Sequence, residues 1–286
     1  AKRLFEYETG KHHLDFSNAY KASFFEYFQE VTDQKAAGSK SNHSIWISAL
    51  KHLRQYHKQP ELTFEEVDQL FLEGFRHYLM HKARTKSGTP LSRNTQSAYF
   101  NKLRAALNQA EQERLLPDNP VRRVKAIQGE KNKRVYLTED EVRALAQAEC
   151  RYDVLKRAFL FSCCTGLRWS DIHKLTWAEL EPFYGHYRIV FTQKKTSGLQ
   201  YLDLNDMAMQ LMGRPGKATE RIFKGLKYSA WHNMELTRWA LQAGITKKVT
   251  FHSARHTFAV IQLNRGVDIY ALSRLLGHSE LRTTEI

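Results

Sequence analysis

The chain has 286 residues, 42% of them apolar, which is enough to bury a core in each of two domains and excludes a disordered polypeptide. Forty-four Lys and Arg against thirty Asp and Glu leave a formal net charge of +14. This charge favours a polyanionic partner such as nucleic acid, with a merely solvated basic surface as the alternative. No apolar run approaches the ~18 residues of a membrane span, and the three cysteines show no CxxC or Cys/His metal spacing. We therefore expect a soluble cytoplasmic protein without a metal or another cofactor.

Apolar residues at helical spacing predict four helices between residues 20 and 116. The first two are marked by Phe24, Phe25, Phe28 and Val31, and by Ile45, Trp46, Ala49, Leu50 and Leu53. The third is expected to begin at a capping box of Thr63 and Glu66 and to bury a face that includes Leu70. The fourth is expected to begin at Ser92 as its N-cap and to end before Pro117. Residues 20–119 are thus predicted to form a helical domain with little strand.

Residues 120–136, PVRRVKAIQGEKNKRVY, carry six basic residues, one acidic residue and no apolar periodicity. This composition predicts an interdomain linker. Such a linker could lie along a phosphate backbone, where each neutralised phosphate adds affinity that falls with salt, or it could simply be solvated. The first segment, residues 1–19, precedes the helical domain and could be the end of a further domain.

The second domain, residues 137–286, is expected to open with a capping box of Thr138 and Glu141. The apolar run 154–164 predicts a buried helix, and alternating apolar residues predict a β-hairpin over residues 187–204. Further helices are expected over residues 252–264 and from Asp268 to Gly277. The fold class is therefore mainly α with one small antiparallel β-sheet.

Polar residues at the edges of these elements could bind a phosphate. Arg168 follows an apolar helix, and Asp171, three residues on, could orient its guanidinium, although such a pair is more often a surface ion pair. His252 and Arg255 share one face at a helix N-terminus, where an anion is favoured. A zinc site is disfavoured because Ser253 stands where the HExxH pattern has Glu. His256 is interpreted as a packed or hydrogen-bonded histidine.

The ordered set TGLR, a hairpin lysine in KKT, HSARHTF and LLGH resembles the catalytic domain of the tyrosine recombinases, the phage-integrase family. The preceding helices and basic linker resemble the SAM-like core-binding domain and connector of that family. This resemblance implies that Arg168 and Arg255 clamp the non-bridging oxygens of a scissile phosphate. It also implies that His278 is a third donor.

The same resemblance assigns the proton transfers. Lys195 would act as general acid on the departing 5′ oxygen, His252 would accept or orient the proton of the nucleophile, and Asp171 would support Arg168. The family's nucleophile is a tyrosine nine residues after the glycine-histidine motif, which is one position past Ile286. We therefore expect the natural protein to cleave DNA through a 3′-phosphotyrosyl intermediate, and the 286-residue chain to bind DNA without cleaving it.

Several partners follow from the resemblance: double-stranded DNA, three further copies of the chain in a homotetramer on synapsed sites, and accessory DNA-bending proteins. The residues predicted to contact DNA are Arg93, Asn94, Thr95 and Lys102 in the fourth helix, and Arg122 and Arg123 in the linker. Ordinary surface polarity is an equally good explanation for each of them.

Three functions stay open on the sequence. The first is a site-specific recombinase, namely the integrase of a bacterial mobile element, acting at the nucleoid. The second is a DNA-binding accessory protein of recombinase descent that cleaves nothing. The third, a topoisomerase IB-like enzyme, is disfavoured because the helical first domain and the short linker resemble an integrase throughout.

Overall fold

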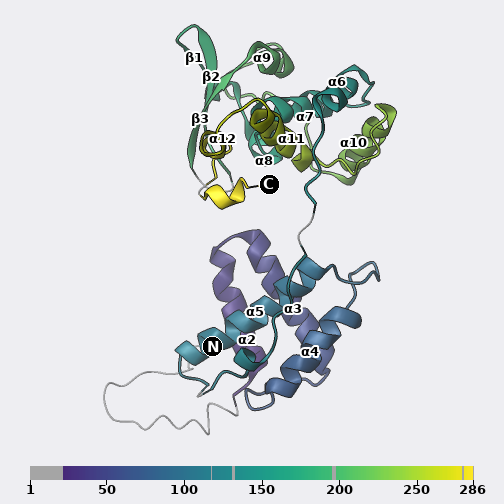
Figure 1. Cartoon of the computed structure of the whole chain (residues 1–286). Helices are drawn as coiled ribbons and strands as arrows, with labels where there is room; N and C mark the ends of the chain where they lie inside the picture. Colours follow the sequence, from purple (N-terminus) through teal and green to yellow (C-terminus); the bar gives the residue numbers. More distant parts are fainter. Residues whose placement is uncertain (1–21, 117, 131–132, 195–197, 279, 286) are drawn as a thin grey trace, which may run out of the picture. The chain divides into compact units, whose positions relative to one another are not determined.

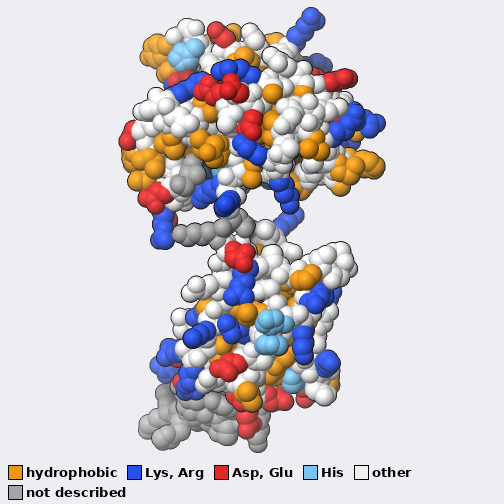
Figure 2. Space-filling model, turned by 45° about the vertical axis from the view of Figure 1, so that its right-hand side comes forward, with side chains coloured by type: hydrophobic (Ala, Val, Ile, Leu, Met, Phe, Trp, Pro, Cys, Tyr) orange, Lys and Arg blue, Asp and Glu red, His pale blue; other side chains and the backbone are white. Residues whose placement is uncertain are grey.

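The computed structural model describes residues 22–116, 118–130, 133–194, 198–278 and 280–285, and the chain divides into two compact units, Ala1–Asn132 and Lys133–Ile286 (Figure 1). None of the helices in the described ranges is long and apolar enough to cross a membrane. Figure 2 shows Lys and Arg side chains spread over both units on the face drawn. The excess positive charge therefore does not by itself mark one binding surface there.

The described part of the first unit, from residue 22 on, contains four α-helices, as the apolar spacing predicted. They are α2 (Phe24–Gln34), α3 (Lys40–His57), α4 (Gln69–His81) and α5 (Arg93–Gln112), with short 3₁₀ turns η1 (Lys35–Ala37) and η2 (Pro120–Arg123). Their apolar faces meet in one core that contains Phe28, Trp46, Phe75 and Phe100. The predicted N-cap of α5 is confirmed, because the Ser92 side chain accepts a hydrogen bond from the backbone N–H of Thr95.

The predicted start of the third helix is wrong. Glu66 accepts hydrogen bonds from the backbone and hydroxyl of Thr63, but the backbone there makes only a turn. The helix begins at Gln69, where the Asp68 side chain accepts from the Phe71 N–H at 2.7 Å. Leu70, which the sequence placed on the buried face, is 76% exposed. Asp68 is the effective N-cap because its carboxylate satisfies a free N–H of the first turn.

The segment expected to be a linker begins as part of the first unit. Val121, Val124 and Ile127 are buried in the same core as the four helices. Beyond them, Asn94 at the start of α5 donates to the Glu130 carbonyl at 3.2 Å and accepts from the Glu130 N–H at 2.9 Å. Apolar residues separated by basic ones gave no helical or strand period, so the sequence did not reveal this packing.

The second unit is mainly helical with one small sheet. In chain order it contains α6 (Glu139–Gln147), α7 (Asp153–Thr165), α8 (Trp169–Lys174), η3 (Trp177–Glu179), β1 (Leu180–Phe183), β2 (His186–Thr192), β3 (Leu199–Leu204), α9 (Asp206–Met212), α10 (Ala230–Gln242), α11 (Phe251–Asn264), α12 (Ile269–Leu275) and η4 (Leu281–Thr283). The capping box of Thr138 and Glu141 that was predicted to open this region is present.

The predicted hairpin is confirmed, and a strand that the sequence did not predict extends it. β2 and β3 pair antiparallel from Tyr187↔Leu204 to Thr192↔Leu199, while β1 pairs with the other edge of β2. In Figure 1 these strands lie along one flank of the unit, while α7 and α11 run through its middle. β1 has four residues and includes Pro182, which suits an edge strand and gives no alternating pattern.

Two glycines shape the backbone around the site described next. Gly166 ends α7 with φ +69°, and a Cβ built on it would lie 2.6 Å from the Phe258 ring. Gly277 follows α12 with φ +61°, and its Cβ would lie 2.3 Å from the Gln193 side-chain amide. Only glycine combines this left-handed backbone with such close packing. Both positions are therefore constrained by backbone conformation and by space.

Candidate active site

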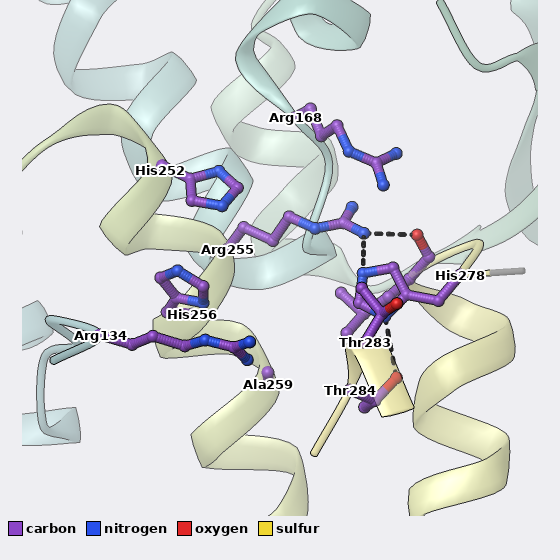
Figure 3. Close-up of a pocket in the computed structure, with 10 residues that line it drawn as sticks. Arg134, Arg168, His252, Arg255, His256, Ala259, His278, Thr283 and Thr284 are labelled. Atoms are coloured by element: carbon purple, nitrogen blue, oxygen red, sulfur yellow. Dashed lines mark hydrogen bonds between the residues drawn. The ribbon is translucent and has the colours of Figure 1, made fainter. Parts of the chain in front are cut away.

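A cavity of about 230 Å³ in the second unit is lined by basic and imidazole side chains from distant parts of the sequence (Figure 3). Its lining residues are Arg134, Arg168, His252, Arg255, His256, Ala259, Leu276, His278, Thr283 and Thr284. Four of the five residues predicted to be catalytic therefore meet here. The fifth, Lys195, follows β2 in the sequence and lies outside the described residues.

Arg255 is the most deeply buried charge of the cavity, with only 5% of its surface exposed. Its Nη1 donates to the Gly166 carbonyl at 2.7 Å, and its Nη2 donates to the Leu276 carbonyl at 2.6 Å and to His278 Nε2 at 2.9 Å. Burial, and then the neighbouring Arg168 charge, lower the pKa of Arg255 to about 9. The side chain therefore stays charged at neutral pH. From α11 it connects the backbone that follows α7, at Gly166, with the backbone that follows α12, at Leu276.

Arg168 enters the cavity from the N-cap position of α8, and its guanidinium lies beside that of Arg255 (Figure 3). Its Nη1 donates to Gln193 Oε1 at 2.9 Å, and Gln193 Nε2 donates in turn to the Leu276 carbonyl at 3.3 Å. Gln193 is only 2% exposed and was missed by the sequence analysis. A polar residue directly after a strand resembles an ordinary turn residue, so only its position next to the KKT turn pointed to it.

Asp171 does not hydrogen-bond the Arg168 guanidinium in the way its spacing suggested. Its buried carboxylate accepts from the Lys194 N–H at 2.8 Å through Oδ1, while Oδ2 has no hydrogen-bond partner among the described residues. Its negative charge opposes the lowering of the pKa of both Arg168 and Arg255. Asp171 therefore holds the base of the β2–β3 turn and acts on the arginines through charge, whereas Gln193 makes the hydrogen bond.

His252 and His256 lie one turn apart on α11, with ring centroids 4.6 Å apart and planes at 80°. Burial is the main cause that lowers the pKa of His256 to about 4, helped by electrostatic repulsion from His252, Arg134 and Arg255. His256 is therefore neutral near pH 7. The sequence placed it away from Arg255, but the structure places its ring on the cavity wall (Figure 3).

Arg134 was missed because it lies in the basic segment before α6, where sequence composition gives no reason to choose one residue. Its side chain lies beside His256 in Figure 3, and its Nη1 donates to the Glu285 carbonyl at 3.4 Å. Within the described ranges, no three His, Cys, Asp or Glu residues are placed to hold a metal ion. The described part of the cavity thus offers cationic and imidazole donors.

This arrangement suits a phosphodiester. Two guanidiniums that open on one cavity can donate paired hydrogen bonds to two phosphate oxygens. Arg255 is buried and Arg168 is half-buried, and hydrogen bonds of charged groups are stronger away from bulk water. The two positive charges also repel each other, and a bound anion would offset that repulsion. His252, exposed at the start of α11, is the imidazole best placed to exchange a proton with an incoming group.

The residues predicted to bind DNA in the first unit are engaged with protein groups. Arg93 Nε donates to the Gln128 carbonyl at 3.1 Å, and Asn94 bonds the Glu130 backbone as described above. Thr95 and Ser92 share a hydroxyl hydrogen bond of 2.8 Å at the N-terminus of α5. These three residues shape the start of α5 and the segment packed on it.

The three basic candidates nearby are also paired. Lys102 Nζ donates to Asn42 Oδ1 at 2.6 Å and lies over the Trp46 ring, and burial lowers its pKa. The other two form ion pairs, Arg122 with Glu111 at 2.9 Å and Arg123 with Asp118. Each of these three side chains therefore already has a contact within the protein.

Comparisons with known proteins agree along most of the chain. Residues 23–127 match the family model described as the phage integrase SAM-like domain, and residues 135–286 match that of the phage integrase family. The tyrosine recombinase XerD of Shewanella oneidensis is 27% identical over 271 residues, which cover 85% of this chain and 84% of that protein. The integrase of Escherichia phage 186 is 28% identical over 205 residues, 70% of this chain and 57% of that protein.

Solved structures share the fold at lower sequence identity. A lambda integrase dimer bound to a COC′ core site has a TM-score of 0.72 and 17% identity, covering 96% of this chain and 81% of that one. The Tn1549 transposon integrase in complex with transposon right end DNA also has a TM-score of 0.72 and 17% identity, covering 92% and 93%. At this identity, the two matches show similarity of fold alone.

Proposed function

The chain belongs to the phage integrase family of tyrosine recombinases, which are site-specific DNA recombinases, and from this premise we propose that its Arg168 and Arg255 pocket binds the scissile phosphate of a DNA substrate. The observation that carries the proposal is the convergence of two guanidiniums on one cavity, one of them fixed by the carbonyls of Gly166 and Leu276. Fixed donors of this kind stabilise the charge that grows on phosphate oxygens in the transition state.

The remaining roles follow from the chemistry of strand cleavage. The phenol oxygen of the family's tyrosine attacks phosphorus, the bond from phosphorus to the 5′ oxygen breaks, and a 3′-phosphotyrosyl link forms. Lys195 would give its proton to the departing 5′ oxygen, and His252 would accept or orient the proton of the phenol. Asp171 supports the lysine assignment, because it holds the backbone of the adjacent Lys194.

Strand exchange would then need no further energy source. Because a phenol is also a good leaving group, a 5′ hydroxyl from a partner strand can reverse the attack. We propose that this happens in a homotetramer on two synapsed duplexes, and that residues 20–119 form the domain that grips DNA beside the catalytic domain. A lambda integrase of the same fold has been solved as a tetramer bound to a Holliday junction, which supports this assembly. Integration of a bacterial mobile element at the nucleoid is the proposed biological reaction.

The test is to trap the covalent adduct. The full-length protein is incubated with a nicked suicide substrate, and the adduct is compared among the wild type, Arg255→Lys and the exposed control Arg143→Lys on α6. A lysine cannot bond both carbonyls and a phosphate in the same geometry. We expect Arg255→Lys to lower the cleavage rate about 100-fold or more, with DNA affinity changed less than about threefold.

Two results would count against the proposal. Unchanged cleavage by Arg255→Lys would remove the clamp assignment. Absence of any adduct with the wild-type protein would favour the alternative of a DNA-binding accessory protein that cleaves nothing.

A further inference from the structure

We propose that Thr284 is a positioning residue of the phosphate pocket, whose hydroxyl accepts a hydrogen bond from the Nδ1–H of His278 and so fixes the orientation of that imidazole. Thr284 follows the turn η4 and is only 1% exposed, although the neighbouring residues 283 and 285 are exposed. Its Oγ1 lies 2.8 Å from His278 Nδ1. Figure 3 shows this contact as the last link of a chain that runs from Arg255 through His278 to Thr284.

The chemistry of the partners settles which imidazole nitrogen carries the proton. The Arg255 guanidinium has donors and no acceptor, so His278 Nε2, 2.9 Å from Arg255 Nη2, must accept. In a neutral ring the proton then resides on Nδ1. Thr284 Oγ1 is therefore the acceptor of the Nδ1–H bond, and a threonine hydroxyl can fill this role because it has two acceptor lone pairs.

The opposite tautomer is unfavourable in this arrangement. A proton on Nε2 would face the Arg255 N–H groups at hydrogen-bond distance, and two donors would meet without an acceptor. When a phosphate oxygen, and not the Arg255 N–H, lies against Nε2, a protonated imidazole can donate through Nε2 while its Nδ1–H still donates to Thr284 Oγ1. Thr284 can thus hold the ring plane in either protonation state.

This orientation is useful for the proposed reaction. With Nδ1 bonded to Thr284, Nε2 is the nitrogen that faces the arginine pocket. His278 was assigned as a third donor to the phosphate. Nε2 can donate there only when the ring is protonated, and the bond from Nδ1–H to Thr284 Oγ1 keeps Nε2 directed at that position. This catalytic consequence rests on the proposed function, whereas the tautomer can be measured without DNA.

The first experiment measures the tautomer. ¹⁵N-labelled histidines in the 286-residue chain are observed by NMR, and the His278 signals are assigned from their loss in His278→Gln. Thr284→Val removes the acceptor at nearly constant volume, and Thr284→Ser keeps it. Thr283→Val is the matched control, because Thr283 lines the same cavity but makes no hydrogen bond to His278 among those described.

We expect the wild type, Thr284→Ser and Thr283→Val to show a protonated Nδ1 and an unprotonated Nε2. In Thr284→Val the Nδ1–H would lack an acceptor, so we expect the ring to turn away from Arg255 and to populate both tautomers. A wild-type spectrum with the proton on Nε2 would overturn the proposal even if no variant folds. So would a Thr284→Val spectrum identical to that of the wild type.

The second experiment measures strand cleavage by the full-length protein. Thr284→Val should slow adduct formation on the order of threefold to tenfold, the effect of one lost hydrogen bond. Thr284→Ser should restore most of the rate, and DNA affinity should stay constant. Equal rates for Thr284→Val and the wild type would refute a positioning role. Intact cleavage by Arg255→Lys would instead refute the proposed function and leave the tautomer result standing.

Discussion

Each charged side chain in the pocket is defined by its hydrogen-bond partners. Arg255 is surrounded by the carbonyls of Gly166 and Leu276, so its orientation is set by backbone that two glycines allow. Arg168 has a side-chain partner, Gln193, which also bonds the Leu276 carbonyl. Removing a partner would leave a buried donor unsatisfied, which costs more than the bond itself contributes. The geometry of the pocket therefore depends on Gly166, Gln193 and Leu276 as well as on the two arginines.

His256 gives the pocket a pH dependence that can be measured as stability. Its pKa is about 4 in the folded chain against 6.5 for an ordinary histidine, so between these values the unfolded chain binds more protons. Stability is therefore present above pH 6.5 and is lost as pH falls toward 4. The whole shift corresponds to about 3 kcal/mol at most, and solvent screening of a half-buried ring reduces the expected effect to about 1–2 kcal/mol.

The wild type should lose unfolding free energy when the pH falls from 7 to 5. We expect His256→Gln to lose about 1 kcal/mol less over the same range. Urea unfolding at both pH values measures this difference. His77→Gln, at an exposed position on α4, serves as the control and should behave like the wild type. Parallel pH curves for His256→Gln and the wild type would show that the histidine is not held neutral by its surroundings.

The sequence predicted which residues meet in the pocket better than it predicted what they contact. Arg168, His252, Arg255 and His278 were expected together and line one cavity. Gln193 and Arg134 were not expected, because a single polar residue after a strand or in a basic segment has no periodic pattern. Their positions depend on tertiary contacts with the residues near Leu276 and Glu285, which lie far away in sequence.

Helices were predictable where an apolar stripe had to be buried, but their ends were predicted less well. At the N-terminus of α5 the predicted N-cap, Ser92, is the one the chain uses. At α4 the predicted start was Thr63, whereas the chain uses Asp68 for the helix and Thr63 for the preceding turn. β1 escaped prediction because a four-residue strand with a proline shows no alternation.

The choice between the two caps leads to a prediction for α4. Asp68→Ala should lower the free energy of unfolding by about 1 kcal/mol, because the Phe71 N–H loses its acceptor. Thr63→Ala should cost less than about 0.5 kcal/mol, because Thr63 caps no helix and its lost hydroxyl bond to Glu66 is exposed to water. Urea unfolding of the two variants side by side measures the difference. A larger loss for Thr63→Ala would mean that the turn, and not Asp68, stabilises this end of the helix.

For the whole molecule, the two-domain organisation was predictable from composition, but the place where the first domain ends was not. Residues 120–130 were expected in a linker because they are basic, yet Val121, Val124 and Ile127 are buried and Asn94 bonds the backbone of Glu130. Basic composition describes the surface of a segment, while three apolar side chains decide where it packs. The net charge of +14 likewise indicated a nucleic-acid partner without locating its binding face.

The Asn94 contact makes a prediction about how the first unit continues into the connecting segment. Asn94→Ala should release residues 128–130, because both backbone bonds of Glu130 to the Asn94 side chain are lost together. Limited trypsin digestion should then cut within residues 122–134 about threefold to tenfold faster than in the wild type, since cleavage follows the population of the open segment. Asn101→Ala is the matched control, because Asn101 is also exposed on α5 but, among the described residues, its side chain bonds Ser97 of its own helix and no residue of the connecting segment.

Equal cutting rates for Asn94→Ala and Asn101→Ala, with unchanged helix content by circular dichroism, would show that the buried Val121, Val124 and Ile127 hold the segment without Asn94. A faster rate for Asn94→Ala alone would mean that the residue chosen from the sequence as a DNA contact instead fixes where the connecting segment leaves the first unit.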